Sequence, residues 1–142
     1  MYGSLDISVG GMIAQRTRLE AISANLANRD VILDSQGRLS PYRRKMVMLA
    51  SGDPTARTEV GRALGVHVTG IQEDPTPPSW RYEPESPYAE KSGSHKGYVP
   101  APNVNPVYEQ IDALAASRAY EANVAAAEAS KSMIAQALRL LA

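Results

Sequence analysis

The last part of the chain, from Asn105 to Leu141, limits the possible folds more than any other feature. Asn105 stands where a helix N-cap is expected, and Pro106 follows at the first helical position, where a missing amide hydrogen costs nothing. The residues after Pro106 contain no proline or glycine and are rich in alanine, the best helix former. They predict one helix of about 55 Å, which is too long to lie inside a compact domain of this chain length.

Two apolar stripes run along this predicted helix. The first stripe consists of Val107, Ile111, Leu114, Ala122, Ala125, Ala129 and Met133, and the second stripe consists of Tyr120, Val124, Ala127, Ile134, Leu138 and Leu141. A single neighbouring helix covers one stripe and leaves the other in water. We therefore expect this helix to touch more than one neighbour.

The beginning of the chain, from Gly3 to Asn28, predicts a second amphipathic helix. Its largest apolar residues recur at a seven-residue step, which favours a coiled-coil seam. These seam residues are Leu5, Met12, Leu19 and Leu26. Gly10 and Gly11 lower the helix propensity of the first turns, and Asn28 is expected to end the helix in the left-handed conformation that asparagine tolerates. We expect the two terminal helices to pair antiparallel.

The middle of the chain has a different pattern, with short β-like runs between turn-forming residues. Tyr42 to Leu49, Val66 to Ile71 and Trp80 to Tyr82 predict two or three strands, and residues 74–78 and 84–102 are rich in proline and predict extended connectors. The fold class is therefore α+β. The predicted parts are an N-terminal helix in residues 1–30, a β-rich and extended middle in residues 31–104, and a C-terminal helix in residues 105–142.

Several classes of function are disfavoured by composition and motifs. The formal net charge is zero, so nucleic acid is not an expected partner, and the longest apolar runs are too short to span a bilayer. The absence of cysteine excludes disulfides and thiol chemistry, and His67 and His95 have no metal-ligand spacing. No nucleophile and base form a recognisable arrangement. We expect no catalysis, cofactor, metal or small-molecule substrate.

The basic run Arg43 to Lys45 has two readings. It suggests a phosphate or nucleic-acid site, but zero net charge and the single neighbouring aromatic residue, Tyr42, favour a charged edge strand that resists aggregation.

Three stretches of the sequence carry a family resemblance. Ser23 to Asn28 matches an S-x-N-x-A-N signature at the end of the first helix, and Ser117 to Val124 matches a signature of the last helix. Pro41 to Lys45 matches the start of a middle region, and residues 97–99 and 102–105 match the approach to the last helix. With these motifs the chain resembles the proximal-rod proteins of the bacterial flagellar basal body. Residues 29–33 depart from that family, which usually has small polar residues there.

The resemblance implies a structural subunit that polymerises through its terminal helices into the hollow drive shaft for motility. It implies export through the flagellar type III apparatus without a cleaved signal, and a place in the periplasmic rod of the basal body. The first twenty residues agree, because they lack the basic and apolar regions of a secretory signal. The implied partners are other proximal-rod subunits, distal-rod subunits, the membrane-ring adaptor and further copies of the chain. The predicted interface residues are Leu5, Met12, Leu19, Asn25, Leu26, Asn28, Arg118, Tyr120, Asn123, Val124, Ile134 and Leu138.

Some of these residues also have a purely local interpretation. Asn25 and Asn28 either form hydrogen bonds across subunits or simply end a helix, and Tyr120 either anchors a neighbour or contacts the first helix of its own chain. Arg118 and Glu121 are close enough on a helix for a weak local ion pair.

Two other functions use the same apolar surfaces. One is a helical adaptor or chaperone-like protein that binds one partner without polymerising. The other is a peripheral membrane protein that binds lipid through residues 124–141, which the lack of a basic polar face disfavours.

Overall fold

Two long helices and two small antiparallel sheets make up the computed structural model, which describes residues 2–141. Along the chain the elements are α1 (Tyr2–Ala27), β1 (Lys45–Ser51), α2 (Glu59–Leu64), β2 (Val66–Glu73), β3 (Ser79–Tyr82), β4 (Tyr98–Ala101) and α3 (Pro106–Leu141). The predicted α+β class, with paired terminal helices and a small β region between them, is confirmed. None of the helices in residues 2–141 combines the length and apolar character needed to cross a bilayer.

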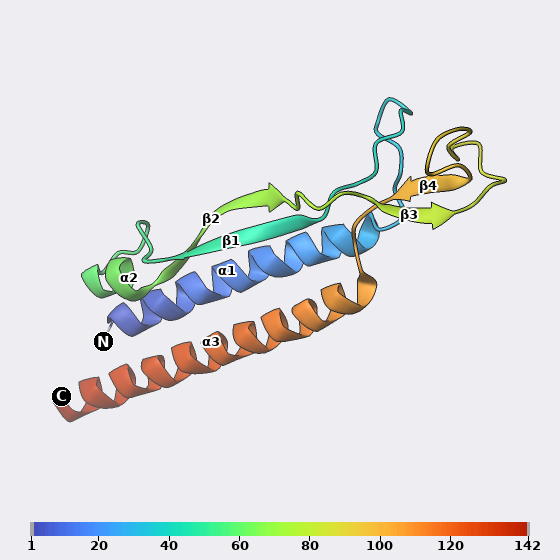
Figure 1. Ribbon diagram of the computed structural model, residues 1–142. Coiled ribbons are helices and arrows are strands. Elements are labelled where there is room, and N and C mark those ends of the chain that lie inside the picture. The colour runs from blue at the N-terminus through green and yellow to red at the C-terminus, as the bar shows by residue number, and fades with distance from the viewer. Residues whose placement is uncertain (1, 142) are drawn as a thin grey trace.

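The terminal helices pack side by side and antiparallel, so the two chain ends lie together (Figure 1). Helix α3 has 36 residues and α1 has 26, so α3 is longer by about 15 Å at 1.5 Å per residue. Two contacts define the register of the helix pair: Gly11 lies against Asn123, and Asn25 binds Glu109. In this register the last part of α3 extends past the start of α1.

The ends of these helices follow their sequence signals, with one exception. Asn105 caps α3 as predicted, because its side-chain oxygen accepts a hydrogen bond from the amide of Val107 at 3.0 Å. The left-handed cap predicted at Asn28 is wrong, since no non-glycine residue in the described part has a positive φ. Asn28 instead closes α1 by donating from its side chain to the carbonyl of Ala24 at 2.8 Å. The side chain thus satisfies a carbonyl at the end of the helix, while the backbone of Asn28 does not adopt the left-handed conformation.

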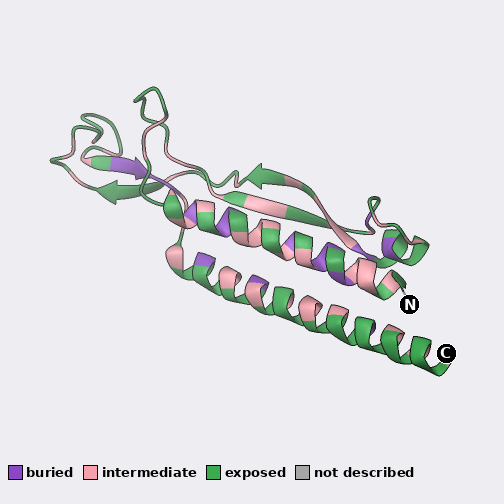
Figure 2. Cartoon of the chain, turned by 180° about the vertical axis from the view of Figure 1, so that it is seen from behind, coloured by how far each residue is buried: buried purple, intermediate pink, exposed green. Residues whose placement is uncertain are grey.

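Strands β1 and β2 form an antiparallel hairpin that lies along α1, on the side away from α3 (Figures 1 and 2). Thr69 is an extra residue in β2, because Met48 lies opposite Gly70 while Leu49 lies opposite Val68. The hydroxyl of Thr69 donates to the carbonyl of Met48 at 3.1 Å. This bulge bends the hairpin, as an added residue in one strand does.

Two elements differ from the sequence predictions. Strand β4 lies inside residues 84–102, which were predicted to be a connector, and it pairs with β3. Its Pro100 is tolerated because a strand of a two-stranded ribbon has a free edge, where no amide donor is needed. The short helix α2 was also not predicted; Thr58 caps it by accepting from the amide of Gly61 at 3.1 Å.

Apart from proline, the buried apolar side chains of residues 2–141 are few, and only Ile22 and Val99 among them are larger than alanine. They are Ala14, Ala21, Ile22, Val99, Ala101 and Ala116. Figure 2 shows that the buried positions of α1 alternate with exposed ones along its length, while most of α3 is exposed. A core of this size contributes little burial energy for a chain of 142 residues.

Candidate assembly site

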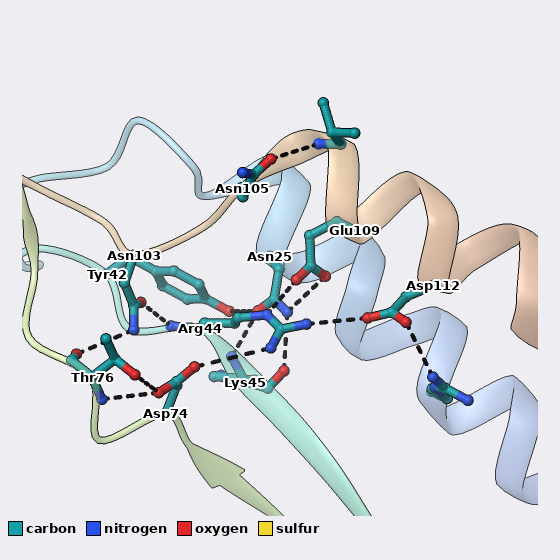
Figure 3. A network of polar contacts seen from close by, with 12 residues as sticks. Asn25, Tyr42, Arg44, Lys45, Asp74, Thr76, Asn103, Asn105, Glu109 and Asp112 are labelled. Carbon is teal, nitrogen blue, oxygen red and sulfur yellow. Dashed lines mark hydrogen bonds and ion pairs between the residues drawn. The ribbon is translucent and has the colours of Figure 1, made fainter.

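A cluster of charged and amide side chains joins the end of α1, the entrance to β1 and the start of α3 (Figure 3). We call Asn25, Tyr42, Arg44, Glu109 and Asp112 the polar junction. Asn25 and Glu109 are 1% and 0% exposed, so most of this chemistry is shielded from water. The polar junction therefore fixes how three segments that are distant in the sequence meet.

Asn25 is fully used within the chain. Its amide nitrogen donates to the Lys45 carbonyl at 2.9 Å and to Glu109 Oε2 at 3.0 Å. Its amide oxygen accepts from the Lys45 backbone N–H at 2.8 Å and from the Tyr42 hydroxyl at 3.0 Å. An asparagine side chain offers two donor hydrogens and two acceptor positions, and all four are occupied here. Asn25 thus ties α1 to β1 and to α3 at once.

Arg44 is the cation that balances the buried carboxylate of Glu109. Its Nε donates to Glu109 Oε1 and its Nη2 lies 3.2 Å from Asp112 Oδ2. The hydrogen bond to Glu109 is the main cause that raises the pKa of the Arg44 guanidinium, and the carboxylates of Glu109, Asp112 and Asp74 add to it. Charge-assisted bonds of this kind are strong, and losing one partner leaves a buried charge uncompensated.

Two further groups depend on the charges of the polar junction. Arg18 of α1 donates to Asp112 Oδ1 at 3.3 Å, which adds an ion pair between α1 and α3. Burial raises the pKa of the Tyr42 hydroxyl, and the negative charges of Glu109 and Glu73 raise it further. Tyr42 is thus held in its neutral form, in which it donates to Asn25.

A second layer of polar contacts connects the polar junction to the proline-rich segments (Figure 3). Asn103 accepts from the Arg44 amide at 3.0 Å and donates to the Thr76 carbonyl at 3.2 Å. Asp74 accepts from the Thr76 amide and hydroxyl, and the hydroxyl bond is the main cause that lowers the pKa of the Asp74 carboxyl. The connector at residues 74–78 and the segment before α3 are therefore both attached to the start of β1.

The basic run at the start of β1 is more than a charged edge. The interpretation that we favoured from sequence does not describe Arg44, whose guanidinium is ion-paired with carboxylates of α3 and with Asp74 at 3.9 Å. The reason is that Glu109 and Asp112 lie more than sixty residues away in the sequence and reach Arg44 only after folding.

Two adjacent glycines let α1 contact both of its neighbouring layers closely. A Cβ placed on Gly11 would lie 2.5 Å from Asn123 Oδ1 of α3, and a Cβ on Gly10 would lie 2.9 Å from the Val66 carbonyl of β2. Both distances are shorter than van der Waals contact. Sequence reasoning treated this pair only as a weakness in the helix, although two neighbouring glycines inside a helix are themselves a sign of close packing on two sides.

The first stripe of α3 is exposed. Val107, Ile111, Leu114 and Met133 keep 61%, 57%, 55% and 59% of their surface in water, and the alanines of this stripe are exposed too. In the second stripe Val124, Ala127 and Ile134 are half-buried, Tyr120 and Leu138 are exposed, and the side chain of Leu141 lies outside the described part. The pairing with α1 thus leaves one stripe uncovered, as predicted.

The predicted seam of α1 is only partly covered. Leu5, Met12, Leu19 and Leu26 are all half-buried, while Val9 and Ile13 are 45% and 59% exposed. Apart from Ile22, the most buried positions of α1 are small or polar, namely Ser8, Gly10, Gly11, Ala14, Ala21 and Asn25. Small residues make the closest contacts because α1 lies between two layers.

The remaining predicted site residues lie as follows. Asn28 donates within its own helix, and Asn123 donates to the Ala119 carbonyl at 2.7 Å beside Gly11. Arg118 and Glu121 are exposed, and the local ion pair proposed between them is not formed in the described part. Tyr120 is 37% exposed. The structure therefore places Asn25 and Asn123 inside the chain and leaves Arg118, Tyr120 and Leu138 on its surface.

Comparison with known proteins gives matches at both helices. Residues 5–31 match a family model described as "Flagella basal body rod protein", and residues 95–140 match one described as "Flagellar basal body rod FlgEFG protein C-terminal". The chain is 37% identical to the "Flagellar basal-body rod protein FlgC" of Borreliella burgdorferi, with 99% of this chain and 97% of the relative aligned. It is also 37% identical to the protein of that name from Bacillus subtilis, with 98% and 97% aligned, and 38% identical to that of Escherichia coli O6:H1, with 95% and 93% aligned.

Proposed function

Because this chain belongs to the flagellar basal-body rod protein family FlgC, it is a structural subunit of the rod and not an enzyme, and we propose that it joins the rod through the outward faces of its terminal helices. The observation that carries this proposal is the exposed first stripe of α3. Val107, Ile111, Leu114 and Met133 place four large apolar side chains, each more than half exposed, along one helix face. Apolar surface of this extent is characteristic of a protein interface.

The outward face of α1 supports the same proposal. Val9 and Ile13 lie on a side of α1 that neither α3 nor the β1–β2 hairpin covers, and half-buried seam residues lie beside them. Burying one exposed leucine or isoleucine is worth about 1.5 to 3 kcal/mol, so several such residues on two helices supply substantial association energy. We propose that Leu5, Met12, Leu19, Leu26, Val124, Ile134 and Leu138 complete their burial against neighbouring subunits, with Tyr120 and Arg118 at the edge.

The polar junction has a positioning role in this proposal. Asn25 and Arg44 hold the β1 strand and both helices in one arrangement, so the helical part, in residues 1–30 and 105–142, carries the β-rich middle at a fixed angle. Asn25 and Asn28 then act within the subunit, by shaping the surface that neighbours meet.

The finer assignments follow from the family resemblance. We propose that the subunit belongs to the proximal rod, in the periplasm, and that its neighbours are other proximal-rod subunits, distal-rod subunits, the membrane-ring adaptor and further copies of itself. We also propose export through the flagellar type III apparatus without a cleaved signal. Residues 2–27 form α1 and pack against α3 and β2, so removing them as a leader would remove half of the helix pair.

The test is a charged substitution on the first stripe, with a matched control. Leu114→Glu introduces a charge into the proposed interface, whereas Leu64→Glu makes the same change at a 70% exposed position on α2. Both leucines are exposed in the monomer, so both variants should keep the circular dichroism spectrum of the unmodified protein. We expect Leu114→Glu to abolish swimming and to be absent from purified basal bodies, while Leu64→Glu swims. Normal incorporation of Leu114→Glu would falsify the role of this stripe.

A further inference from the structure

The exposed residues of α1 form one line along the helix. Apart from Ser4, every exposed residue of α1 belongs to this line. Its members, which we call the α1 line, are Tyr2, Val9, Ile13, Arg16, Glu20, Ser23 and Ala27. Ile13 lies about half a turn around α1 from Gly11, which faces α3. The α1 line therefore points away from the α3 helix of its own copy.

A line of exposed residues with the same spacing runs along α3. Read from its C-terminal side, this α3 line consists of Gln136, Ala129, Ala125, Ala122, Arg118, Ala115 and Ile111. Both lines advance by seven residues and then alternately by four and three, which is the spacing of a coiled-coil seam. Ala125 lies about half a turn around α3 from Asn123, which faces Gly11, so the α3 line points away from α1 of its own copy. Only a second copy can bring the two lines together.

In an antiparallel alignment of the two lines, large side chains meet small ones. Val9 and Ile13 lie opposite two alanines of α3, whereas Ile111 of α3 lies opposite Ala27 of α1. Alanine lets two helices approach closely, and a large side chain opposite a small one fills the space between them. Val9, Ile13 and Ile111 are 45%, 59% and 57% exposed in one copy. The antiparallel contact therefore covers apolar surface on both helices.

The charged residues select the antiparallel alignment. In it Glu20 lies opposite Arg118, and Arg16 lies opposite Ala122 and next to Glu121. Arg118 and Glu121 form no ion pair in the described part of the chain, so both are available to a neighbour. Arg16 Nε binds Glu20 Oε1 at 3.0 Å, and among residues 2–141 Glu20 Oε2 has no ion-pair partner. The same spacing also permits a parallel alignment, but that places Arg16 opposite Arg118, and like charges oppose association.

We propose that the α1 line of one copy packs antiparallel against the α3 line of a second copy. This inference rests on the proposed function and assigns the two exposed helix faces to each other. Because each copy offers one line to each of two neighbours, the contact is heterologous and repeats from copy to copy. Since α1 and α3 are also antiparallel within one copy, all copies point in the same direction.

The register of the two helix pairs gives the step between copies. Within one copy residue 27 lies level with residue 107, because Asn25 binds Glu109. Between copies the proposed alignment places Ala27 level with Ile111, which is four residues further along α3. Successive copies are therefore displaced by about 6 Å along the helix direction, at 1.5 Å per residue.

Disulfide cross-linking tests this contact, because the chain has no cysteine of its own. Ile13→Cys and Ala125→Cys lie opposite each other between copies, but on outward faces of different helices within one copy. In basal bodies that carry this double variant, oxidation should produce dimers and higher multimers of the chain in a ladder. The control combines Ile13→Cys with Ala115→Cys, a change at an exposed position of the α3 line about 15 Å from Ala125. The control should stay monomeric, because only the parallel alignment brings its two positions together.

Reversal of charge tests the same alignment without cysteines. Arg118→Glu places a carboxylate opposite Glu20 and should lower the amount of the chain in basal bodies about tenfold, since facing like charges oppose association. Adding Glu20→Arg should restore incorporation, because each contact between copies regains one cation opposite one anion. Both positions are exposed and point away from each other within one copy, so a contact inside the subunit does not explain a rescue. A double variant that incorporates no better than Arg118→Glu would overturn the alignment.

The outcomes of cross-linking separate this contact from the broader function. A ladder from Ile13→Cys with Ala125→Cys and none from the control supports the proposal. Products from the control, or no products from either pair in basal bodies that contain the variants, overturn it. If the cysteine variants do not assemble, a density map of basal bodies with the unmodified protein decides: Ile13 against Ala125 of a neighbouring copy supports the proposal, and any other neighbour contradicts it. Absence of the unmodified protein from basal bodies would instead refute the proposed function itself.

Discussion

Replacing Asn25 by alanine should destabilise the fold more than any other single amide loss on α1. The change removes four hydrogen bonds, to Lys45 N–H, the Lys45 carbonyl, Glu109 and Tyr42. A net contribution of about 1 kcal/mol per bond gives a loss of about 4 kcal/mol, and the buried partners left without Asn25 act in the same direction. The total stability of a domain is about 5 to 15 kcal/mol, and the small core places this chain toward the lower end.

Urea unfolding followed by circular dichroism at 222 nm measures this loss. With a slope of about 2 kcal/mol/M, Asn25→Ala should lower the midpoint by about 2 M. Asn28→Ala is the matched control, because Asn28 makes one hydrogen bond at the end of the same helix and its loss should cost about 1 kcal/mol. Asn25→Asp should be at least as harmful as alanine at pH 7, since it places a carboxylate against Glu109. Equal midpoints for Asn25→Ala and Asn28→Ala would refute the reasoning.

Two further predictions concern packing and pH. Gly11→Ala should lower the melting temperature although alanine has the higher helix propensity, because the new Cβ lies 2.5 Å from Asn123 Oδ1. Adding Asn123→Ala should restore the melting temperature. A double variant that melts no higher than Gly11→Ala would contradict the close contact. The pKa of Asp74 is lowered in the folded state, mainly by the Thr76 hydroxyl, so its stabilising effect is present above about pH 4 and is lost as pH falls through the folded-state pKa. Asp74→Asn should flatten the fall in melting temperature between about pH 4 and pH 2, and an unchanged slope would exclude this contribution.

Helix α3 was predictable from the sequence because its signals are local. Asn105 and Pro106 mark its start, and the alanine-rich run without glycine or proline carries it to Leu141. The exposure of one of the two stripes was predictable as well, since two stripes on one helix cannot both face a single partner, but the sequence did not indicate that the exposed one is the first stripe. Local propensity and periodicity are sufficient for such elements.

Strand β4 and helix α2 were not predictable in the same way. Tyr98–Ala101 is a strand because β3 lies beside it, and its proline and neighbouring glycine gave no β signal. Helix α2 has six residues and depends on the Thr58 cap and on packing near the start of α1. Elements this short take their conformation from neighbours more than from their own residues.

The polar junction illustrates the same limit for side chains. The sequence singled out Asn25 through its motif, but it did not indicate that Lys45, Tyr42 and Glu109 complete its hydrogen bonds. Arg44 looked like part of a basic edge because Glu109 and Asp112, its partners on α3, are separated from it by more than sixty residues. Charge pairing across such distances appears only when the three segments are brought together.

Solvent access to the first stripe, before and after assembly, tests the central claim most directly. A single cysteine at Ile111, in this otherwise cysteine-free chain, can be labelled with a maleimide in the isolated protein and in purified basal bodies, with Leu64→Cys as the exposed reference. Coverage by neighbouring subunits predicts rapid labelling at both positions in the isolated protein and at least a tenfold slower reaction at position 111, but not at position 64, in the basal body. Equally rapid labelling of position 111 in both states would contradict assembly through this face.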